Sequence, residues 1–564
     1  MKTPLRTCCI LFSAFSLVSA CATRADISTF PRPHSTYLPA PPHSVLAQSV
    51  GPQVAAHAGL SGFYLLVAGH EAFEARLALI QQAQTSLDLQ YYAAMEDRTG
   101  HAILDALVAA ARRGVRVRLL LDDMNIKNPD NVVALAATEP HFEARVFNPV
   151  TTGGRSTLAR VSAMMGDYDH LERRMHNKSL IADDTFAILG GRNLADEYFG
   201  VNTDVNFRDL DVLIAGALPD RVSRSFDHYW NSPEAYPVAA LADRPPEQAV
   251  IDRWKNDPQS TYKTTEPKEK NALPIPDAAT ANALLSKATQ NLIWAHAWLA
   301  VDNPDKVDPD NQATEPAPTP AAASSAATAT AASTPRPPAV NASGAASSKP
   351  AQGLARMLDK AQHEFIIISA YFVPREGGTE KLSEMEQRGV HVRVLTNSLA
   401  STDVAAVHAG YRHYRKALLA SGVQLNEFKP IGGEPSGAGI SKGSSRASLH
   451  TKAYVVDRKY LMIGSFNLDP RSVNLNTEQA VLINSPQLAG QVAALYDTST
   501  QPQYSYSVTF KPDANGKTSS DSPLQWQAND ENGKPTTWTS DPEAGFTRRF
   551  VSKFVSWLPA DGEL

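Results

Sequence analysis

Runs of apolar residues recur along the chain at the spacing of short strands separated by helices. Residues 85–94, TSLDLQYYAA, and 364–373, EFIIISAYFV, are strand-like, and a helix-like segment follows each of them. A further apolar run follows each helix-like segment, RRGVRVRLLLDD at 112–123 and QRGVHVRVLTNS at 387–398. Strands that alternate with helices predict an α/β fold whose sheets are covered on both faces.

The stretch RRMHNKSLIADD, residues 173–184, places polar side chains where the apolar pattern predicts a buried strand. Leu180, Ile181 and Ala182 indicate that the strand is covered. Because alternate side chains of an extended chain face the same way, His176 and Lys178 point to one side. An imidazole beside an ammonium group suits an anionic ligand.

A second copy of this pattern lies in SLHTKAYVVDRKYLMIGSFN, residues 448–467. The aligned pairs are His176 with His450, Lys178 with Lys452, Asp183 with Asp457, Gly190 with Gly464, Gly191 with Ser465, Asn193 with Asn467 and, further downstream, Asp209 with Glu478. The strand-like runs upstream also correspond. Since an internal repeat outweighs any prediction for a single element, the chain is a duplication.

The N-terminus, MKTPLRTCCILFSAFSLVSAC, has two basic residues and then an apolar segment too short to span a membrane. These features are typical of a secretory signal. Its end, Val18 to Cys21, resembles the lipobox of bacterial lipoproteins, in which cleavage precedes a cysteine that becomes acylated. Cys21 would be the only cysteine left after cleavage, so no disulfide could form within the mature chain.

We therefore expect a membrane-anchored lipoprotein on the periplasmic side. Ala22 follows the cysteine in place of the Asp that favours inner-membrane retention, so the resemblance favours the outer membrane. Ordinary signal cleavage with an incidental cysteine is the alternative.

Composition changes along the chain predict its domain boundaries. The tract 316–348 is mostly Ala, Thr, Ser and Pro, and such a composition cannot bury enough apolar surface to order itself. The expected organisation is a signal peptide at 1–20, a tether at 21–58, a first domain at 59–240, a bridging segment at 241–350 with a disordered insertion at 303–350, a second domain at 351–500 and a β-rich extension at 501–564. Within the extension, TRRFVSKFVSWL is expected to be a helix packed on the domain rather than on a membrane.

Two His-x-Lys-x4-Asp units with matching Gly and Asn resemble the phospholipase D superfamily. The stretches RRMHNKSLIADDTFAILGGRNLADEYFG and GSFNLDPRSVNLNTE are most similar to bacterial cardiolipin synthases, in the branch called cardiolipin synthase C. The likeness extends over most of residues 60–560. It implies two tandem α/β domains, each a mixed sheet flanked by helices, with a pseudo-twofold active site at their interface. The catalytic roles of the family then fall on His176, Lys178, Asn193, His450, Lys452 and Asn467.

The chemistry of phosphodiester transfer explains these residue types. Two lysines and two asparagines supply cations and donors to the phosphate oxygens without a metal or a cofactor. One histidine attacks phosphorus and the other protonates the leaving alkoxide, and the resemblance slightly favours His176 as the nucleophile. Asp209 and Glu478 are the candidate acids that orient the two imidazoles.

Three activities use this set of residues. By resemblance, the first is a phosphatidyltransferase that makes cardiolipin from phosphatidylglycerol and a second phospholipid, either phosphatidylethanolamine or phosphatidylglycerol. The second is a hydrolytic phospholipase D, with water as the acceptor. The third, a nuclease, is disfavoured by the membrane anchor and by a net charge of −5, because polyanion binding needs clustered Lys and Arg. A non-enzymatic scaffold is disfavoured while both motifs are intact.

Phospholipids and a membrane surface are therefore the expected partners, nucleic acid is not, and the resemblance allows an accessory subunit. Outside the motif, Asp183 and Asp457 are expected to fix local structure, as are Gly190 and Gly464. His408 lies in TNSLASTDVAAVHAGYRHYRKALL, which is interpreted as a substrate-pocket segment. His408 is accordingly a candidate substrate-binding residue.

Overall fold

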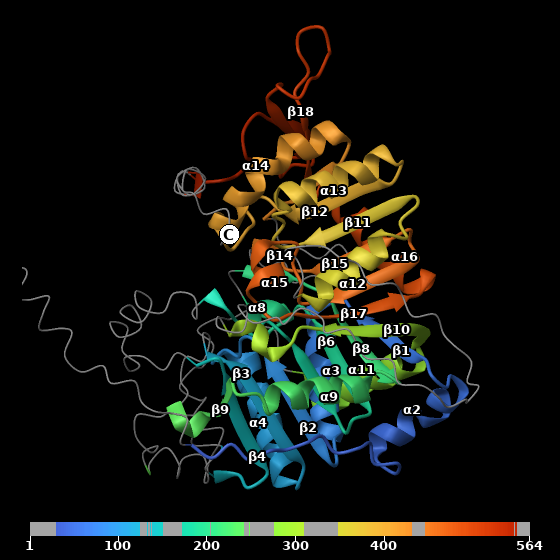
Figure 1. Cartoon of the computed structure of the whole chain (residues 1–564), viewed down its shortest axis with the longest axis vertical. Coiled ribbons are helices and arrows are strands. Elements are labelled where there is room, and N and C mark those ends of the chain that lie inside the picture. The colour runs from blue at the N-terminus through green and yellow to red at the C-terminus, as the bar shows by residue number, and fades with distance from the viewer. Residues whose placement is uncertain are drawn as a thin grey trace, which may run out of the picture.

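The computed structural model of the chain describes residues 30–123, 138–149, 172–202, 205–241, 276–308, 348–430 and 446–545, with a few isolated positions between and after these ranges. The predicted signal peptide, residues 1–20, and Cys21 lie outside the described residues, as does most of the Ala/Pro/Ser/Thr tract. The described chain forms two α/β halves stacked along the long axis of the molecule, the first half at the bottom of Figure 1 and the second at the top.

The first half is built on a mixed sheet, as predicted. Three central strands are parallel, and the remaining pairs are antiparallel. From edge to edge the order is β9 (Ala235–Pro237), β4 (Phe142–Phe147), β3 (Arg116–Asp122), β2 (Ser86–Tyr91), β5 (Ser179–Ala182), β6 (Phe186–Gly190), β8 (Asp211–Gly216) and β1 (Ser61–Leu66). The helices are α2 (Val45–Ala56), α3 (Gly69–Gln82), α4 (Arg98–Arg112), α8 (Asp196–Phe199), α9 (Pro219–Trp230) and α11 (Ala278–Gln290), with the 3-10 turn η3 (Val238–Leu241).

The second half repeats this plan. Its sheet runs β20 (Pro535–Trp538), β19 (Leu524–Asn529), β18 (Ser505–Phe510), β13 (Gln424–Phe428), β12 (His391–Asn397), β11 (Glu364–Ser369), β15 (Lys452–Val456), β16 (Tyr460–Gly464), β17 (Gln479–Asn484) and β10 (Ile293–Val301). Its helices are α12 (Lys349–Leu358), α13 (Arg375–Gln387), α14 (Ala405–Ser421), α15 (Pro470–Asn474) and α16 (Pro486–Ser499). The strands β18 to β20 form an antiparallel meander that extends the sheet beyond β13.

Two strand pairings join the halves. The start of β10 pairs with β1, and the rest of β10 pairs with β17, so the two sheets are continuous through one strand. Separately, β7 (Val205–Arg208) of the first half pairs in parallel with β14 (Arg446–Leu449) of the second. This second pairing ends directly before His450, and it therefore sets that residue against the first half.

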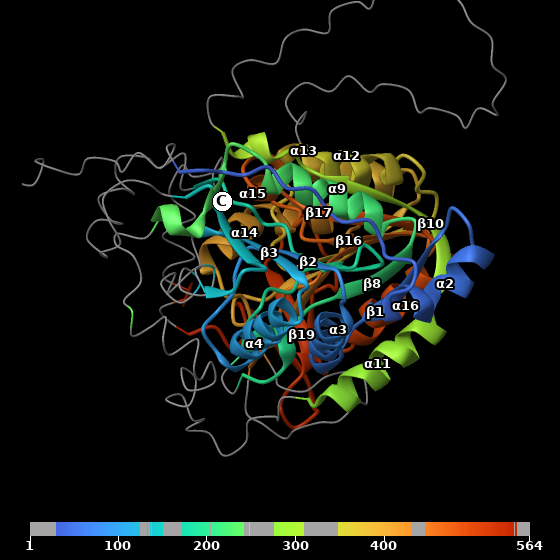
Figure 2. The ribbon, with the colours of Figure 1, turned by 90° about the horizontal axis from the view of Figure 1, so that it is seen from below.

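The hydrophobic core continues across the interface between the halves. Helices cover both faces of the first sheet, with α9 and α3 on opposite sides of the strands (Figure 2). One core cluster contains Tyr229 and Trp230 from α9 together with Val492 and Tyr496 from α16. The halves share apolar core as well as strands, which fixes their relative placement.

Part of the expected tether is docked on the first half. Arg145 Nη2 donates to the carbonyl of Pro33 at 2.5 Å, and the Tyr37 amide donates to Asp227 at 2.7 Å. Helix α2 follows and buries Leu46 and Val50 in the first core. Of the range 21–58 expected to be a tether, residues 30–58 thus belong to the first domain. Composition obscured this because the Pro-rich stretch is held mainly by hydrogen bonds to its backbone and to Tyr37.

The bridging segment is also more structured than its composition indicated. Strand β10 is the counterpart of β1, and α11 packs on α3. The predicted insertion begins too early, because residues 304–307 form a 3-10 turn in which Lys306 Nζ bonds the buried Asp302 carboxylate at 2.7 Å. Val307 is fully buried in the shared core. The predicted C-terminal helix TRRFVSKFVSWL lies almost wholly outside the described residues.

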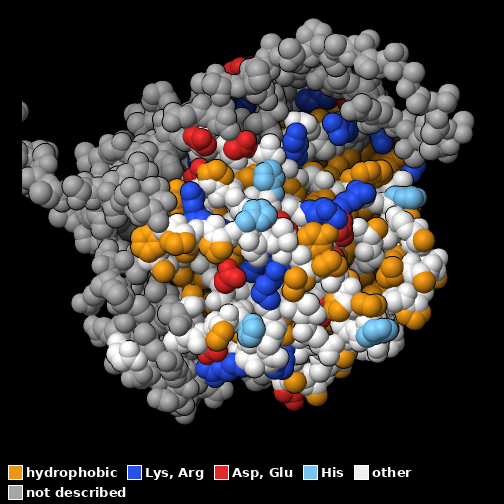
Figure 3. Space-filling model, turned by 60° about the horizontal axis from the view of Figure 1, so that its bottom comes forward, with side chains coloured by type: hydrophobic (Ala, Val, Ile, Leu, Met, Phe, Trp, Pro, Cys, Tyr) orange, Lys and Arg blue, Asp and Glu red, His pale blue; other side chains and the backbone are white. Residues whose placement is uncertain are grey.

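The surface of the described chain has few large apolar side chains. Trp298 on β10 is the most exposed of them, at 53 %. On the face shown in Figure 3, acidic and basic side chains are interspersed among apolar and neutral ones. Among the described residues, no helix has both the length and the apolar character needed to cross a bilayer.

The glycines that end β6 and β16 stand where no side chain fits. A Cβ at Gly464 would lie 2.1 Å from the carbonyl oxygen of Gln479 and 2.6 Å from the Ala480 Cα, both on the backbone of β17. We therefore expect Gly464→Ala to cost about 2 kcal/mol or more of stability, through strain in a packed sheet. Thermal unfolding followed by circular dichroism measures the loss.

Gly490 provides the matched control, because it lies within α16 and a Cβ there meets nothing within 4 Å. Gly490→Ala should leave the melting temperature unchanged or raise it, since alanine is the better helix former by about 1 kcal/mol. Equal melting temperatures for Gly464→Ala and the wild-type protein would show that the strand ends can separate.

Candidate active site

Each motif histidine is held by backbone contacts to the opposite half. The His176 amide donates to the carbonyl of Thr477 at 2.9 Å, next to a parallel bridge between Met175 and Thr477. The His450 amide donates to the carbonyl of Arg208 at 2.8 Å, at the end of the β7–β14 pair. These reciprocal contacts bring the two halves of the motif into one site.

The two orienting acids bind the histidines crosswise. Nδ1 of His176, in the first half, lies 3.0 Å from both carboxylate oxygens of Glu478 in the second. Nδ1 of His450, in the second half, lies 2.6 Å from Oδ2 of Asp209 in the first. When Nδ1–H donates to a carboxylate, Nε2 carries the lone pair in the neutral imidazole and the exchangeable proton in the imidazolium. The interface thus supplies both imidazoles with the same arrangement.

The two acids differ by one methylene, and their surroundings differ to match. Glu478 accepts hydrogen bonds from the Ser472 hydroxyl at 2.8 Å and from the Ser465 hydroxyl. Gly191 stands where the first half would have the counterpart of Ser465, and a Cβ there would lie 2.2 Å from an Asp209 oxygen. The Gly/Ser difference within the repeat therefore accommodates the shorter acid.

The motif lysines are buried beside the histidines. Lys178 Nζ donates to the carbonyl of His176 at 2.6 Å, and Lys452 Nζ donates to the carbonyl of His450. Each ammonium also lies over a tyrosine ring, Lys178 over Tyr92 at 5.4 Å and Lys452 over Tyr371 at 5.9 Å from the centroid. Those contacts fix each ammonium close to its imidazole, as an anionic ligand requires.

The motif asparagines hold the loops that carry these tyrosines. Asn193 Oδ1 accepts from the Ala93 amide at 3.3 Å, and Asn467 Oδ1 accepts from the Tyr371 amide at 3.4 Å. Asn193 Nδ2 also donates to the Tyr198 hydroxyl at 2.9 Å. The asparagines, which follow β6 and β16, therefore connect the ends of these strands to the loops that carry the two tyrosines.

Aromatic rings around the imidazoles are the residues that sequence reasoning missed. Tyr92 meets His176 edge-on at 5.2 Å, while Tyr198 and Phe207 each lie 5.1 Å from the His450 ring. Tyr92 and Tyr371 both lie just after the repeated strands but are one position out of register, since the amides that the two asparagines hold belong to Ala93 and Tyr371, so the repeat carried only an approximate signal. Tyr198 and Phe207 have no such signal.

Burial dominates the protonation of the site. It lowers the pKa of His176 to about 4, although the charge of Glu478 opposes the shift, and it lowers that of His450 well below the usual value. Burial also lowers the pKa of Lys178 to about 7 and reduces that of Lys452. The pKa values fall because burial removes the water that stabilises each cationic form, and because the two lysines repel one another. With no ligand bound, both imidazoles are neutral at pH 7.

The remaining motif residues, two aspartates and two glycines, support the backbone around the site. The Asp183 carboxylate accepts from the amides of Gln84, Thr85 and Ser86, and Asp457 accepts from those of residues 362–364. Each aspartate thereby fastens the turn after its histidine strand to the start of the neighbouring antiparallel strand, β2 or β11. Gly190 resembles Gly464, since a Cβ there would lie 2.0 Å from Asp211 Oδ1.

His408 is placed differently from the expectation that it lines a substrate pocket. It is 3 % exposed, and its Nε2 lies 2.7 Å from Arg415 Nη2. Arg415 also contacts Glu427 at 3.1 Å and Asp541 at 3.0 Å. These contacts make His408 part of a buried ion network that attaches α14 to the C-terminal extension, not to the motif residues.

This network is also the one group of metal-ligand type among the described residues. The ligand atoms of His408, Glu427 and Asp541 lie within 4.8 Å of one another. The Arg415 guanidinium contacts all three and supplies the cation that the two acids need. The arrangement is therefore an ion-pair cluster and not a fit for a metal ion.

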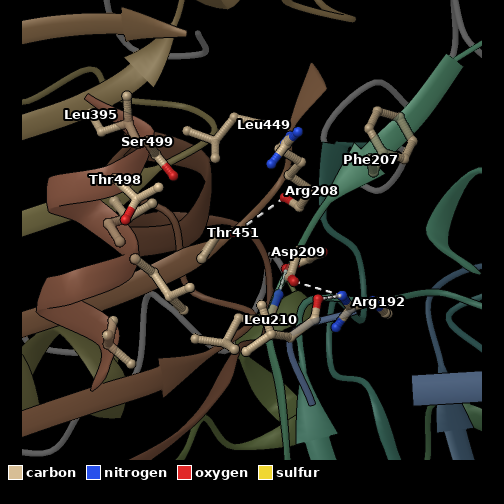
Figure 4. Close-up of a pocket in the computed structure, with 14 residues that line it drawn as sticks. Arg192, Phe207, Arg208, Asp209, Leu210, Leu395, Leu449, Thr451, Thr498 and Ser499 are labelled. Carbon is tan, nitrogen blue, oxygen red and sulfur yellow. Dashed lines mark hydrogen bonds between the residues drawn. The ribbon is translucent and has the colours of Figure 1, made fainter. Parts of the chain in front are cut away.

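A cavity of about 180 Å³ lies between the halves, behind the Asp209 carboxylate (Figure 4). Its walls are mainly apolar, with Leu210 from the first half and Leu395 and Leu449 from the second. Asp209 reaches its edge, and the guanidinium of Arg192 bonds the carbonyl of Asp209 at 2.6 Å. Neither motif histidine lines it. The low polarity behind the acid strengthens the His450–Asp209 hydrogen bond.

Comparison with known proteins places this geometry in a family. The family model described as "Cardiolipin synthase, PLD-like domain" matches residues 77–230 and 354–499, one match in each half. Cardiolipin synthase C of Escherichia coli (strain K12) is 34 % identical over 525 residues, covering 92 % of this chain and 99 % of the relative. Cardiolipin synthase B of the same strain is 22 % identical, covering 88 % and 90 %.

Among solved structures, a phosphatidylserine synthase of Haemophilus influenzae Rd KW20 aligns with a TM-score of 0.49 and 14 % identity, covering 81 % of this chain and 91 % of that one. The two sequence matches carry the assignment. With a family model that matches both halves and a relative that is 34 % identical over nearly its whole length, the chain belongs to the cardiolipin synthase family of phospholipase D-like proteins.

Proposed function

We propose that this enzyme is a phosphatidyltransferase that makes cardiolipin from phosphatidylglycerol and a second phospholipid, either phosphatidylethanolamine or phosphatidylglycerol. The observation that carries the proposal is the crossed pair of hydrogen bonds, His176 to Glu478 and His450 to Asp209, which assembles two imidazoles and two ammonium groups into one site. Its membership of the cardiolipin synthase family supports the choice of substrate.

In the first step, Nε2 of one histidine attacks the phosphorus of the donor lipid, and the bond from phosphorus to the headgroup oxygen breaks. The other imidazolium gives its proton to that oxygen, so the headgroup leaves as an alcohol and a phosphatidyl-histidine forms. The carboxylate on each Nδ1 stabilises the positive charge that its imidazole acquires, as in a catalytic triad.

In the second step, the histidine that gave up its proton acts as a base. It takes the proton of a hydroxyl on the glycerol headgroup of phosphatidylglycerol, whose oxygen attacks phosphorus. The phosphorus–nitrogen bond breaks, the first histidine is restored and cardiolipin is released. The reaction exchanges one phosphodiester for another and needs no added energy source.

The two buried lysines provide electrostatic stabilisation for both steps. Without a ligand, burial and mutual repulsion lower the pKa of Lys178 and of Lys452. A bound phosphodiester brings a negative charge that opposes the repulsion and raises the pKa of the lysines and histidines together. The bound ligand thus favours the protonated form of the histidine that gives up its proton in the first step.

The membrane location is part of the proposal. Cleavage before Cys21 and acylation of that cysteine would hold the enzyme on the periplasmic side, with the outer membrane favoured. Among the described residues, Arg32, eleven residues after Cys21, is the first with a hydrogen bond to the first domain, so the chain between them reaches at most about 40 Å. Such a short tether would keep the first domain close to the lipid surface.

We expect His176→Ala and His450→Ala each to abolish turnover without unfolding the protein, because each histidine supplies one of the two groups that move protons or attack phosphorus. The assay uses membranes from cells that lack their own cardiolipin synthases and express this protein. Labelled phosphatidylglycerol is added with and without phosphatidylethanolamine, and mass spectrometry identifies the products.

Labelled cardiolipin made by the wild-type protein and by neither variant would establish transfer. The comparison with and without phosphatidylethanolamine would identify the donor. Phosphatidic acid as the sole product would make water the acceptor and the enzyme a hydrolase. Cardiolipin that forms in native membranes but not with the purified protein would identify an accessory subunit as required. An active single-histidine variant would refute the two-histidine mechanism.

The pKa of Lys178 predicts an alkaline limit to the reaction. A lysine whose pKa is lowered to about 7 is charged below that pH and loses its proton above it. Since kcat/KM reports the free enzyme, it should fall as the pH rises through about 7. Lys178→Arg, which stays charged, should be slower and should fall less steeply than the wild-type protein above pH 7, as a pH series from 6 to 9 would show. A limb at the same pH in both proteins would mean that another group titrates.

Acylation at Cys21 has a separate test. In cells fed labelled palmitate, the wild-type protein should carry the label and sediment with outer membranes in a density gradient. Cys21→Ala should carry no label and should appear in the soluble periplasmic fraction. Unlabelled wild-type protein would mean ordinary signal cleavage.

A further inference from the structure

A carboxylate that the two-histidine mechanism leaves unassigned stands beside the second half of the site. Asp403 lies in the loop before α14, and its side chain is exposed. Its Oδ2 accepts a hydrogen bond of 2.6 Å from the Tyr371 hydroxyl. The substrate-pocket segment expected at residues 396–419 therefore does bring a polar group toward the site, but that group is Asp403 and not His408.

Tyr371 connects this carboxylate to the catalytic machinery. The Lys452 ammonium lies 5.9 Å from the centroid of the Tyr371 ring, and Asn467 holds the Tyr371 amide. The charge of Asp403 reaches further, since it opposes the effect of burial on the pKa of both Lys452 and His450. Asp403 is therefore close enough to act on a ligand at His450.

The charge of Asp403 is unfavourable for a site that binds only a phosphate. Asp209 and Glu478 each bond a histidine, whereas no Lys, Arg or His nitrogen of the described residues lies within 4 Å of the Asp403 carboxylate. A negative group there repels the phosphodiester unless the ligand itself brings a positive charge next to its phosphate. An ammonium group a short chain away from the phosphate would supply that charge and would donate to the carboxylate.

We propose that Asp403, held in place by Tyr371, selects a donor phospholipid whose headgroup carries a primary ammonium. This inference rests on the proposed phosphatidyl transfer and names the residue that chooses its donor. With the ammonium on Asp403, the leaving oxygen lies on the His450 side. His450 then gives its proton to the departing amino alcohol, and His176 is the nucleophile that forms the bond to phosphorus.

The test compares two donors within the same vesicles. Purified full-length protein acts on vesicles of phosphatidylethanolamine and phosphatidylglycerol with identical acyl chains, and the release of labelled ethanolamine and of labelled glycerol is measured. Asp403→Asn, which keeps the shape and removes the charge, should lower kcat/KM for ethanolamine release by about tenfold to a hundredfold, as for loss of a hydrogen bond between charged groups. Glycerol release should stay within about twofold.

Two companion variants sharpen the result. Asp359→Asn removes an exposed carboxylate at the end of α12 and controls for the general effect of one less negative charge at an anionic lipid surface. It should change neither rate. Tyr371→Phe removes the hydroxyl that holds Asp403, and it should lower ethanolamine release in the same direction by a smaller factor.

The outcomes separate this inference from the proposed function. Equal losses with both donors would make Asp403 a support for Lys452 and His450 and would overturn the donor selection. Unchanged release of both headgroups in Asp403→Asn would also overturn it while transfer itself stands. If the purified protein is inactive, the same comparison is made in the native membranes of the first assay. A wild-type protein that releases neither headgroup in either setting would overturn the proposed transfer, and the inference with it.

Discussion

The crossed hydrogen bonds between each histidine and the acid of the opposite half are the constraint on which this structure depends. His176 takes its carboxylate from Glu478, and His450 takes its carboxylate from Asp209. Neither half alone contains a complete imidazole–carboxylate pair. The continuous strand β10, the β7–β14 pair and the core shared by α9 and α16 therefore serve chemistry as well as stability, because they hold the two halves in register.

Burial gives the site its reactivity and also its need for a ligand. Removing two lysines and two histidines from water lowers the pKa of all four. In the free protein burial thus disfavours the cationic forms, although Asp209 and Glu478 oppose the shift. A bound phosphodiester adds negative charge beside these groups and favours their cationic forms. The cations then already stand where the transition state develops negative charge, so little reorganisation is needed.

The duplication is symmetric in plan and asymmetric in detail. Gly191 faces the shorter acid, while Ser465 bonds the longer one. A tyrosine lies beside each motif lysine, although Tyr92 and Tyr371 are one position out of register in the repeat. Among the contacts described, Asp403 and Phe207 lie only on the His450 side. Such differences favour one imidazole as the nucleophile and the other as the acid, since each histidine meets the bound donor in different surroundings.

The sequence by itself determined the duplication, the α/β class and the set of paired residues, because a repeat of His, Lys, Gly and Asn at equal spacing is a local pattern. It could also have pointed to Tyr92 and Tyr371. Only the tertiary structure decided that the acids bind crosswise, that residues 30–58 and β10 belong to the folded domains, and that His408 joins a buried ion network. These outcomes depend on contacts between residues that are 100 or more positions apart, and spacing along the chain carries no information about which distant partner a side chain meets.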